Sequence, residues 1–128
     1  MHQAHHTVSN GAIDLAVFEG GNPHGPTVVM VHGWPDTHEL WTGVSQHLDS
    51  AFRLISYDSR GAGASSVPAS VEAYRLEALA SDLGAVIDAV SPDAPVHVLA
   101  HDWGSVETWE AVCEPGAARR IASFTSVS

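Results

Sequence analysis

The stretch VHVLAHDWGSVETW, residues 96–109, decides the fold because it predicts a strand that passes into a helix through a short turn. The apolar run at 95–100 is typical of a strand buried in a parallel sheet. The residues from about 104 to 112 favour a helix. Asp102 stands between them, where an acidic side chain could be either a nucleophile or a helix cap.

Outside this stretch, apolar periodicity predicts an alternation of strands and helices. Asp36 and Glu39 have the spacing of a capping box at the start of a helix, and a second helix is expected over 71–90. The order βαβαβαβ indicates one domain with a doubly wound, mostly parallel sheet and helices on both faces. The further strands are expected at 13–18, near a sheet edge, and at 27–31, 52–57 and 121–127.

The charge of the chain excludes some partners. A formal net charge of -10 with only 5 Lys and Arg opposes electrostatic attraction to nucleic acid or to an anionic membrane. No apolar stretch approaches the ~20 residues of a membrane span. The polar N-terminal sequence does not resemble a secretory signal, so we expect a cytoplasmic protein.

The sequence predicts no cofactor and no metal site. Cys113 stands alone, which excludes an intrachain disulfide and the usual cysteine-based metal site. His2, His5 and His6 could bind a metal, but we expect them to lie in a terminus without fixed geometry. Small neutral ligands therefore remain the favoured partners.

Three glycine-bearing loops each follow a predicted parallel strand and so should meet at one edge of the sheet. They are HGWPD at 32–36, DSRGAGAS at 58–65 and AHDWGS at 100–105. The middle loop does not complete a dinucleotide-binding pattern, because Ser66 stands where the third glycine should be. We expect that loop to be a turn fastened by Asp58 and Arg60, and all three loops to line one pocket.

Asp102 has the spacing of a nucleophile elbow, with the small residues Ala100 and Gly104 on either side. This loop alone leaves the nucleophile and the helix cap equally open. The first loop favours the nucleophile, because it can aim the Trp34 amide at the point that the Trp103 amide faces. Two converging N–H donors make an oxyanion hole, which a helix cap does not need.

With these motifs the chain resembles the N-terminal part of an α/β-hydrolase of the epoxide hydrolase branch. The resemblance runs through VVMVHGWPD, YDSRGAGASSVP and HVLAHDWGS, and is strongest to actinobacterial proteins in which such a domain precedes a short-chain dehydrogenase domain. No dehydrogenase motif occurs here. The resemblance implies an α/β-hydrolase fold truncated after about the sixth strand with no cap domain, so that residues 1–128 are the N-terminal part of a single domain.

The resemblance also implies roles for three residues. Asp102 matches the nucleophile, the amides of Trp103 and Trp34 match the oxyanion hole, and the peptide bond between Trp34 and Pro35 would be cis. The implied substrate is a small neutral organic molecule such as an epoxide, and the product is a vicinal diol. Haloalkane dehalogenases, the second alternative, typically carry Asn at the position of Trp34.

The family's histidine base, its charge-relay acid and the tyrosines of its cap match no residue of this chain. One hypothesis is therefore an epoxide hydrolase segment that is inactive alone and needs a complementing C-terminal segment. The alternative is a non-catalytic remnant or interaction module. In either case we expect an apolar sheet edge near Val127 to favour self-association.

Overall fold

Six strands form a single sheet in the order β1-β2-β4-β3-β5-β6 in the computed structural model, which describes residues 4–128. Strands β3, β4, β5 and β6 run parallel, and the hairpin of β1 and β2 is antiparallel to them. This is the mostly parallel sheet that the sequence predicted. The strands are β1 (Ala4–Asn10), β2 (Ile13–Gly21), β3 (Thr27–Val31), β4 (Arg53–Tyr57), β5 (Val96–His101) and β6 (Ile121–Val127).

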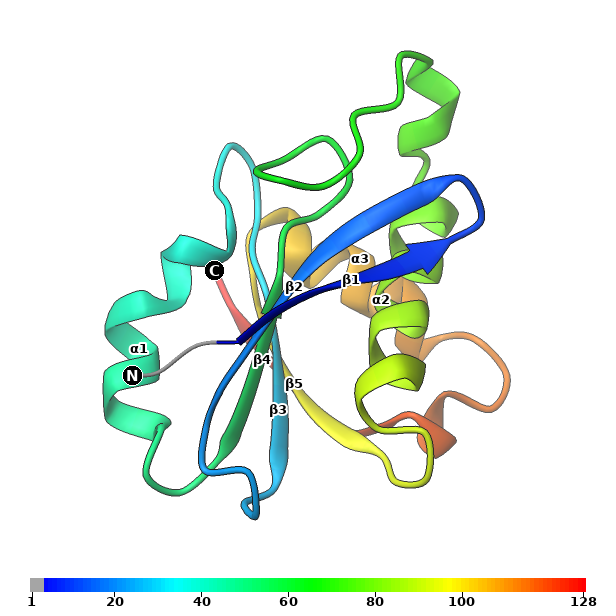
Figure 1. Cartoon of the computed structure of the whole chain (residues 1–128). Coiled ribbons are helices and arrows are strands. Elements are labelled where there is room, and N and C mark those ends of the chain that lie inside the picture. Colours follow the sequence, from blue (N-terminus) through cyan, green and yellow to red (C-terminus); the bar gives the residue numbers. More distant parts are fainter. Residues whose placement is uncertain (1–3) are drawn as a thin grey trace.

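Helices cover both faces of this sheet (Figure 1). Helix α1 (Thr42–Leu48) lies on one face, and α2 (Leu76–Val90) and α3 (Trp103–Val112) lie on the other. Side chains of β3 alternate between the two cores: Val29 and Val31 pack on the side of α2, whereas Val28 and Met30 pack on the side of α1 with Trp41. The sheet is therefore buried on both faces at its centre, as expected from the continuous apolar run of β3.

The first strand was missed by sequence reasoning. Residues Ala4–Asn10 pair with β2 through a turn at Gly11, where φ is 60°. His5 and His6 therefore lie in a strand, and the expectation of a terminus without fixed geometry was wrong for them; His2 lies outside the described residues. Only Val8 of this strand is buried, so its sequence carries little apolar periodicity. Within residues 4–128 no cluster of His, Cys, Asp and Glu forms a metal site.

Two helix boundaries differ from their predictions. Thr37, not Asp36, caps the first helical segment, since its hydroxyl accepts a hydrogen bond from Glu39 N–H; a 3₁₀ turn over His38–Trp41 then leads into α1. The helix expected over 71–90 is divided into a 3₁₀ turn, Val71–Tyr74, and α2. Arg75 separates them because its backbone is extended, with ψ at 152°.

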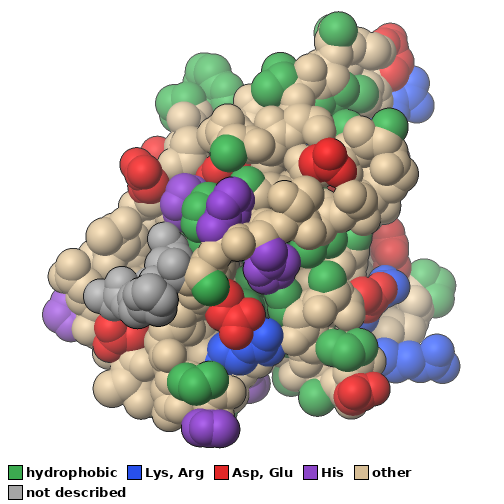
Figure 2. All heavy atoms as spheres, viewed as in Figure 1, with side chains coloured by type: hydrophobic (Ala, Val, Ile, Leu, Met, Phe, Trp, Pro, Cys, Tyr) green, Lys and Arg blue, Asp and Glu red, His purple; other side chains and the backbone are tan. Residues whose placement is uncertain are grey.

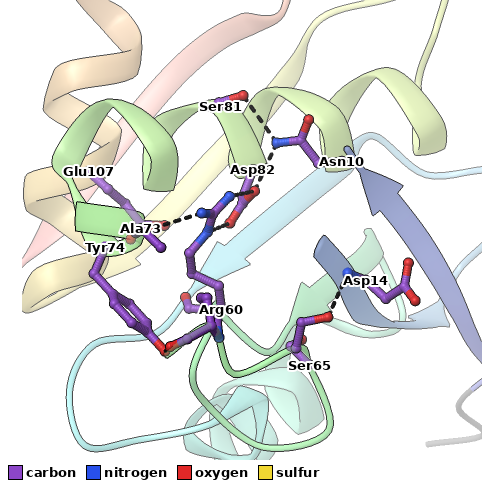
Figure 3. Close-up of polar contacts among 12 residues, drawn as sticks. Asn10, Asp14, Arg60, Ser65, Ala73, Tyr74, Ser81, Asp82 and Glu107 are labelled. Atoms are coloured by element: carbon purple, nitrogen blue, oxygen red, sulfur yellow. Dashed lines mark hydrogen bonds and ion pairs between the residues drawn. The ribbon is translucent and has the colours of Figure 1, made fainter. Parts of the chain in front are cut away.

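Arg60 contacts both segments of this divided helix. We expected it to fasten its own turn, but two of its nitrogens contact Asp82 of α2 at 2.6 and 2.7 Å, and a third donates to Ala73 O of the 3₁₀ turn at 2.7 Å (Figure 3). The two side chains are only 8% and 2% exposed. Asn10 of β1 also donates to Asp82 at 2.8 Å, so this buried pair joins the hairpin, the loop after β4 and α2.

Surface charge is dispersed in keeping with the acidic composition. Figure 2 shows one face of the molecule, and the described part of this face carries no continuous basic patch. In the described chain no helix has the length and apolar character needed to cross a bilayer.

We predict that Arg60→Met will lower the free energy of unfolding by about 3–5 kcal/mol, because it leaves the Asp82 carboxylate buried without its cation. Arg120→Met is the matched control: its pair with Asp88 is 48% and 54% exposed, and its loss should cost less than about 1 kcal/mol. Urea unfolding followed by circular dichroism measures both. Equal losses in the two variants would contradict a structural role for the buried pair.

Candidate active site

Asp102 occupies a sharp turn between β5 and α3. Its φ is 55° and its ψ is −129°, and among residues 4–128 it is the only residue other than glycine with a positive φ. A side chain in this backbone conformation is strained and persists only where the surrounding structure holds it. The turn therefore has the strained geometry expected of a nucleophile elbow.

Small neighbours make this turn possible. A methyl group on Gly104 would overlap the carbonyl oxygens of Val31 and His32 at the end of β3. A methyl group on Gly33 would overlap the side chain of Asp102. The two glycines thus allow the start of α3 and the loop after β3 to approach more closely than any larger residue permits.

The Asp102 carboxylate accepts a hydrogen bond from the first loop. Its Oδ2 accepts a hydrogen bond from Trp34 N–H at 3.0 Å, across 68 residues of sequence, and its side chain makes no capping hydrogen bond to α3. The nearby backbone amides of Trp103 and Trp34 hold the pKa of Asp102 below its usual range. The side chain is thus an exposed, ionised carboxylate on which two backbone N–H groups converge.

His32 fixes the first loop and is not a free base. Its Nδ1 lies 2.6 Å from Gly33 O, and its Nε2 accepts the Ser59 N–H at 3.0 Å. Since a backbone N–H only donates, Nε2 carries no proton and the ring is the neutral Nδ1–H tautomer. Burial lowers the pKa of His32, in agreement with this neutral form.

The second loop is held by Asp58, as expected from the sequence. Its buried carboxylate accepts hydrogen bonds from His38 N–H at 2.9 Å and Ala64 N–H at 3.0 Å, and it pairs with His38 Nδ1 at 2.7 Å. Burial acts to raise the pKa of Asp58, but these hydrogen bonds outweigh it and the pKa is lowered. The contact with His38 ties the loop to the start of the first helical segment.

The three loops meet at one cavity of about 710 Å³, as predicted, a size suited to a small organic ligand. Trp34 and Trp103 contribute to its wall and flank Asp102, which itself stands beside the cavity. Sequence reasoning missed the contribution of α2, α3 and the 3₁₀ turn before α2. Their lining residues are Tyr74, Leu76, Leu79 and Glu107. Leu76 and Leu79 belong to the apolar pattern of the predicted helix, whereas Glu107 is an acidic residue within a predicted helix and carries no signal of a site.

Known proteins share the fold of this chain. The family model described as alpha/beta hydrolase fold matches residues 26–128. The chain belongs to the α/β-hydrolase fold family. Within it, the chain is similar to epoxide hydrolases: it is 36% identical over 105 residues to Epoxide hydrolase A of Mycobacterium tuberculosis, a match that covers 81% of this chain and 32% of that protein.

A higher identity is found with "Probable oxidoreductase EphD" of Mycobacterium tuberculosis, at 56% over 120 residues. That match covers 94% of this α/β-hydrolase chain but only 20% of the EphD protein. Among solved structures, epoxide hydrolase VrEH1 from Vigna radiata has a TM-score of 0.89 at 30% identity, over 98% of this chain and 40% of that one. The chain thus spans well under half the length of these relatives.

One structural implication of the resemblance is found in the molecule. The peptide bond between Trp34 and Pro35 is cis. The Trp34 amide is aimed at the Asp102 carboxylate, as a shared anion site requires. His101, by contrast, does not serve this carboxylate as a base, since its Nδ1 lies 3.1 Å from the backbone oxygen of Val127 on β6.

We predict that Gly104→Ala will lower the free energy of unfolding by about 1–3 kcal/mol, because the added methyl group meets two backbone oxygens that cannot move without shifting β3. Gly43→Ala in α1 is the control. A methyl group there meets nothing within 4 Å, and alanine should stabilise the helix by up to about 1 kcal/mol. Thermal and urea unfolding measure both. A stabilising Gly104→Ala would contradict the close approach.

Proposed function

We propose that this chain carries the aspartate nucleophile and the oxyanion hole for the hydrolysis of epoxides to vicinal diols. The hydrogen bond from Trp34 N–H to the Asp102 side chain is the observation that carries the proposal. A helix cap would direct the carboxylate to the amides of its own helix. Here a residue with a strained backbone accepts a hydrogen bond from Trp34, 68 residues earlier in the sequence.

In the first step, one oxygen of the Asp102 carboxylate attacks a ring carbon of the epoxide. The C–O bond to that carbon breaks, an ester forms, and the epoxide oxygen leaves with the electron pair and takes up a proton from water. The lowered pKa of Asp102 keeps the nucleophile ionised at neutral pH. A carboxylate suits this attack because water can cleave the resulting ester, whereas a serine would yield an inert ether.

In the second step, water adds to the carboxyl carbon of Asp102 and the tetrahedral intermediate carries a negative oxygen. The amides of Trp103 and Trp34 would stabilise that oxygen, and collapse of the intermediate would release the diol. This step needs a base to activate water. Within residues 4–128, His32 and His101 are both directed elsewhere, so we propose that the ester persists unless a further segment supplies the base.

The haloalkane dehalogenase alternative would use the same aspartate but would break a carbon–halogen bond. Trp34 in place of the usual Asn favours the epoxide, and the epoxide hydrolases among the relatives support that preference. The non-catalytic alternative predicts that Asp102 has no special reactivity. One experiment separates the three possibilities.

We predict that incubation with excess styrene oxide will alkylate Asp102 once, giving a stable ester on the peptide that contains residues 101–105. Intact-protein and peptide mass spectrometry measure the adduct. The rate should be constant at neutral pH and fall only when acid protonates Asp102, below the usual aspartate pKa of about 3.9, because the pKa is lowered.

Asp102→Ala should abolish this adduct, whereas Asp36→Ala, which removes a carboxylate that lines the cavity, should leave it unchanged. Equal labelling of both carboxylates, or of neither, would contradict the nucleophile. Bromide release from an alkyl bromide, with no epoxide adduct, would favour the dehalogenase. Many turnovers of diol would support the nucleophile but overturn the proposed need for a further base.

A further inference from the structure

Glu107 lines the cavity from α3, one helical turn beyond Trp103. The residue is only 3% exposed, so its carboxyl group lies within the wall and not at the surface. The mechanism proposed above does not use it. A buried acidic residue in the wall of a cavity is unusual enough to require a physical explanation.

The hydrogen bonds around Glu107 show which form of the carboxyl group is stable. Tyr57 OH donates to Oε1 at 3.0 Å, and no other hydrogen bond to this carboxyl group occurs within residues 4–128. The nearby cation, Arg60, is already paired with Asp82 and with Ala73 O. A buried carboxylate without a cation is costly, so the neutral acid is the stable form.

The charged and titratable groups that face Glu107 agree with this assignment. They are Tyr57 from β4, Arg60 from the following loop and Asp82 from α2. Burial raises the pKa of Glu107 to about 8, the Tyr57 hydrogen bond and Arg60 act to lower it, and Asp82 acts to raise it. At neutral pH the side chain therefore carries a proton that it can donate.

We infer that the protonated carboxyl group of Glu107 is a hydrogen-bond donor in the cavity wall, which selects ligands with a neutral oxygen at that position. Oε1 is engaged by Tyr57, which leaves the O–H on Oε2 without a protein acceptor among the described residues. A ligand oxygen would supply the missing acceptor. The loss of that hydrogen bond would disfavour ligands of the same shape that lack the oxygen.

A neutral ligand oxygen suits this wall better than a charged group. Leu76, Leu79 and Trp103 line the cavity around Glu107, and bringing an ion into such surroundings carries a large desolvation cost. If the proposed function holds, on which this last step rests, the preferred epoxides carry a second oxygen, as a ketone, ether or hydroxyl, away from the ring. The donor role of Glu107 does not itself depend on the reaction.

Two matched probes test the donor without any epoxide. Acetophenone and α-methylstyrene have nearly the same shape, but only the ketone accepts a strong hydrogen bond. We expect the chain at pH 6.5 to bind acetophenone roughly three- to tenfold more tightly. The preference should be lost as pH rises through about 8, because the ionised Glu107 no longer donates. Titrations followed by ¹H–¹⁵N NMR shifts at Trp103 measure both affinities.

Two variants identify the group responsible. Glu107→Leu should bind both probes equally at every pH, whereas Glu107→Gln, whose amide still donates, should keep the preference and lose its pH dependence. Circular dichroism melting curves establish that each variant is folded. Infrared spectroscopy should also show a protonated carboxyl band that Glu107→Gln removes.

Asp102→Ala tests the donor role of Glu107 separately from the proposed function, because this variant should lose alkylation but keep the preference for acetophenone. Equal affinity for the two probes in the unmodified chain would overturn the inference, as would binding of neither probe. A preference that survives in Glu107→Leu would assign the donor to another group and overturn it equally.

Discussion

The close approach of the β5–α3 turn to the end of β3 governs the rest of the site. Only glycine fits at positions 33 and 104, because a side chain at either position would meet Asp102 or the backbone oxygens of β3. That approach brings the Trp34 amide within hydrogen-bond distance of Asp102. The strained backbone at Asp102 stands where two strand ends pack closely together, and that packing helps to hold it in place.

The loops around the elbow are held by polar groups withdrawn from solvent. His32 joins the first two loops in its neutral form, and Asp58 fastens the second loop as a carboxylate that accepts several hydrogen bonds. Arg60 and Asp82 then attach that loop to α2. Because each group has its partners in place, the cavity wall can be rigid although it is built largely from loops.

Charge pairing in this wall explains why two acidic residues on neighbouring helices differ in character. Asp82 is paired with Arg60 through two hydrogen bonds, and Asn10 donates to it as well. Glu107 has a tyrosine hydroxyl as its partner and no cation of its own. The same buried surroundings therefore stabilise an ion at Asp82 and a neutral acid at Glu107, beside an exposed anion at Asp102.

Local sequence was sufficient for most of the elements and for the position of the turn at Asp102, because apolar periodicity and small residues act over a few positions along the chain. The central strand 27–31 and the meeting of three loops at one edge could be anticipated on that basis. Strand β1 could not, since a polar edge strand is stabilised by its pairing with β2 and not by its own pattern. The start of α2 and the partner of Arg60 depended equally on contacts between segments distant in sequence. Glu107 is the clearest case: its sequence marks it as an ordinary helical acid, and only its burial beside Tyr57, without a free cation, makes it a neutral group in the cavity wall.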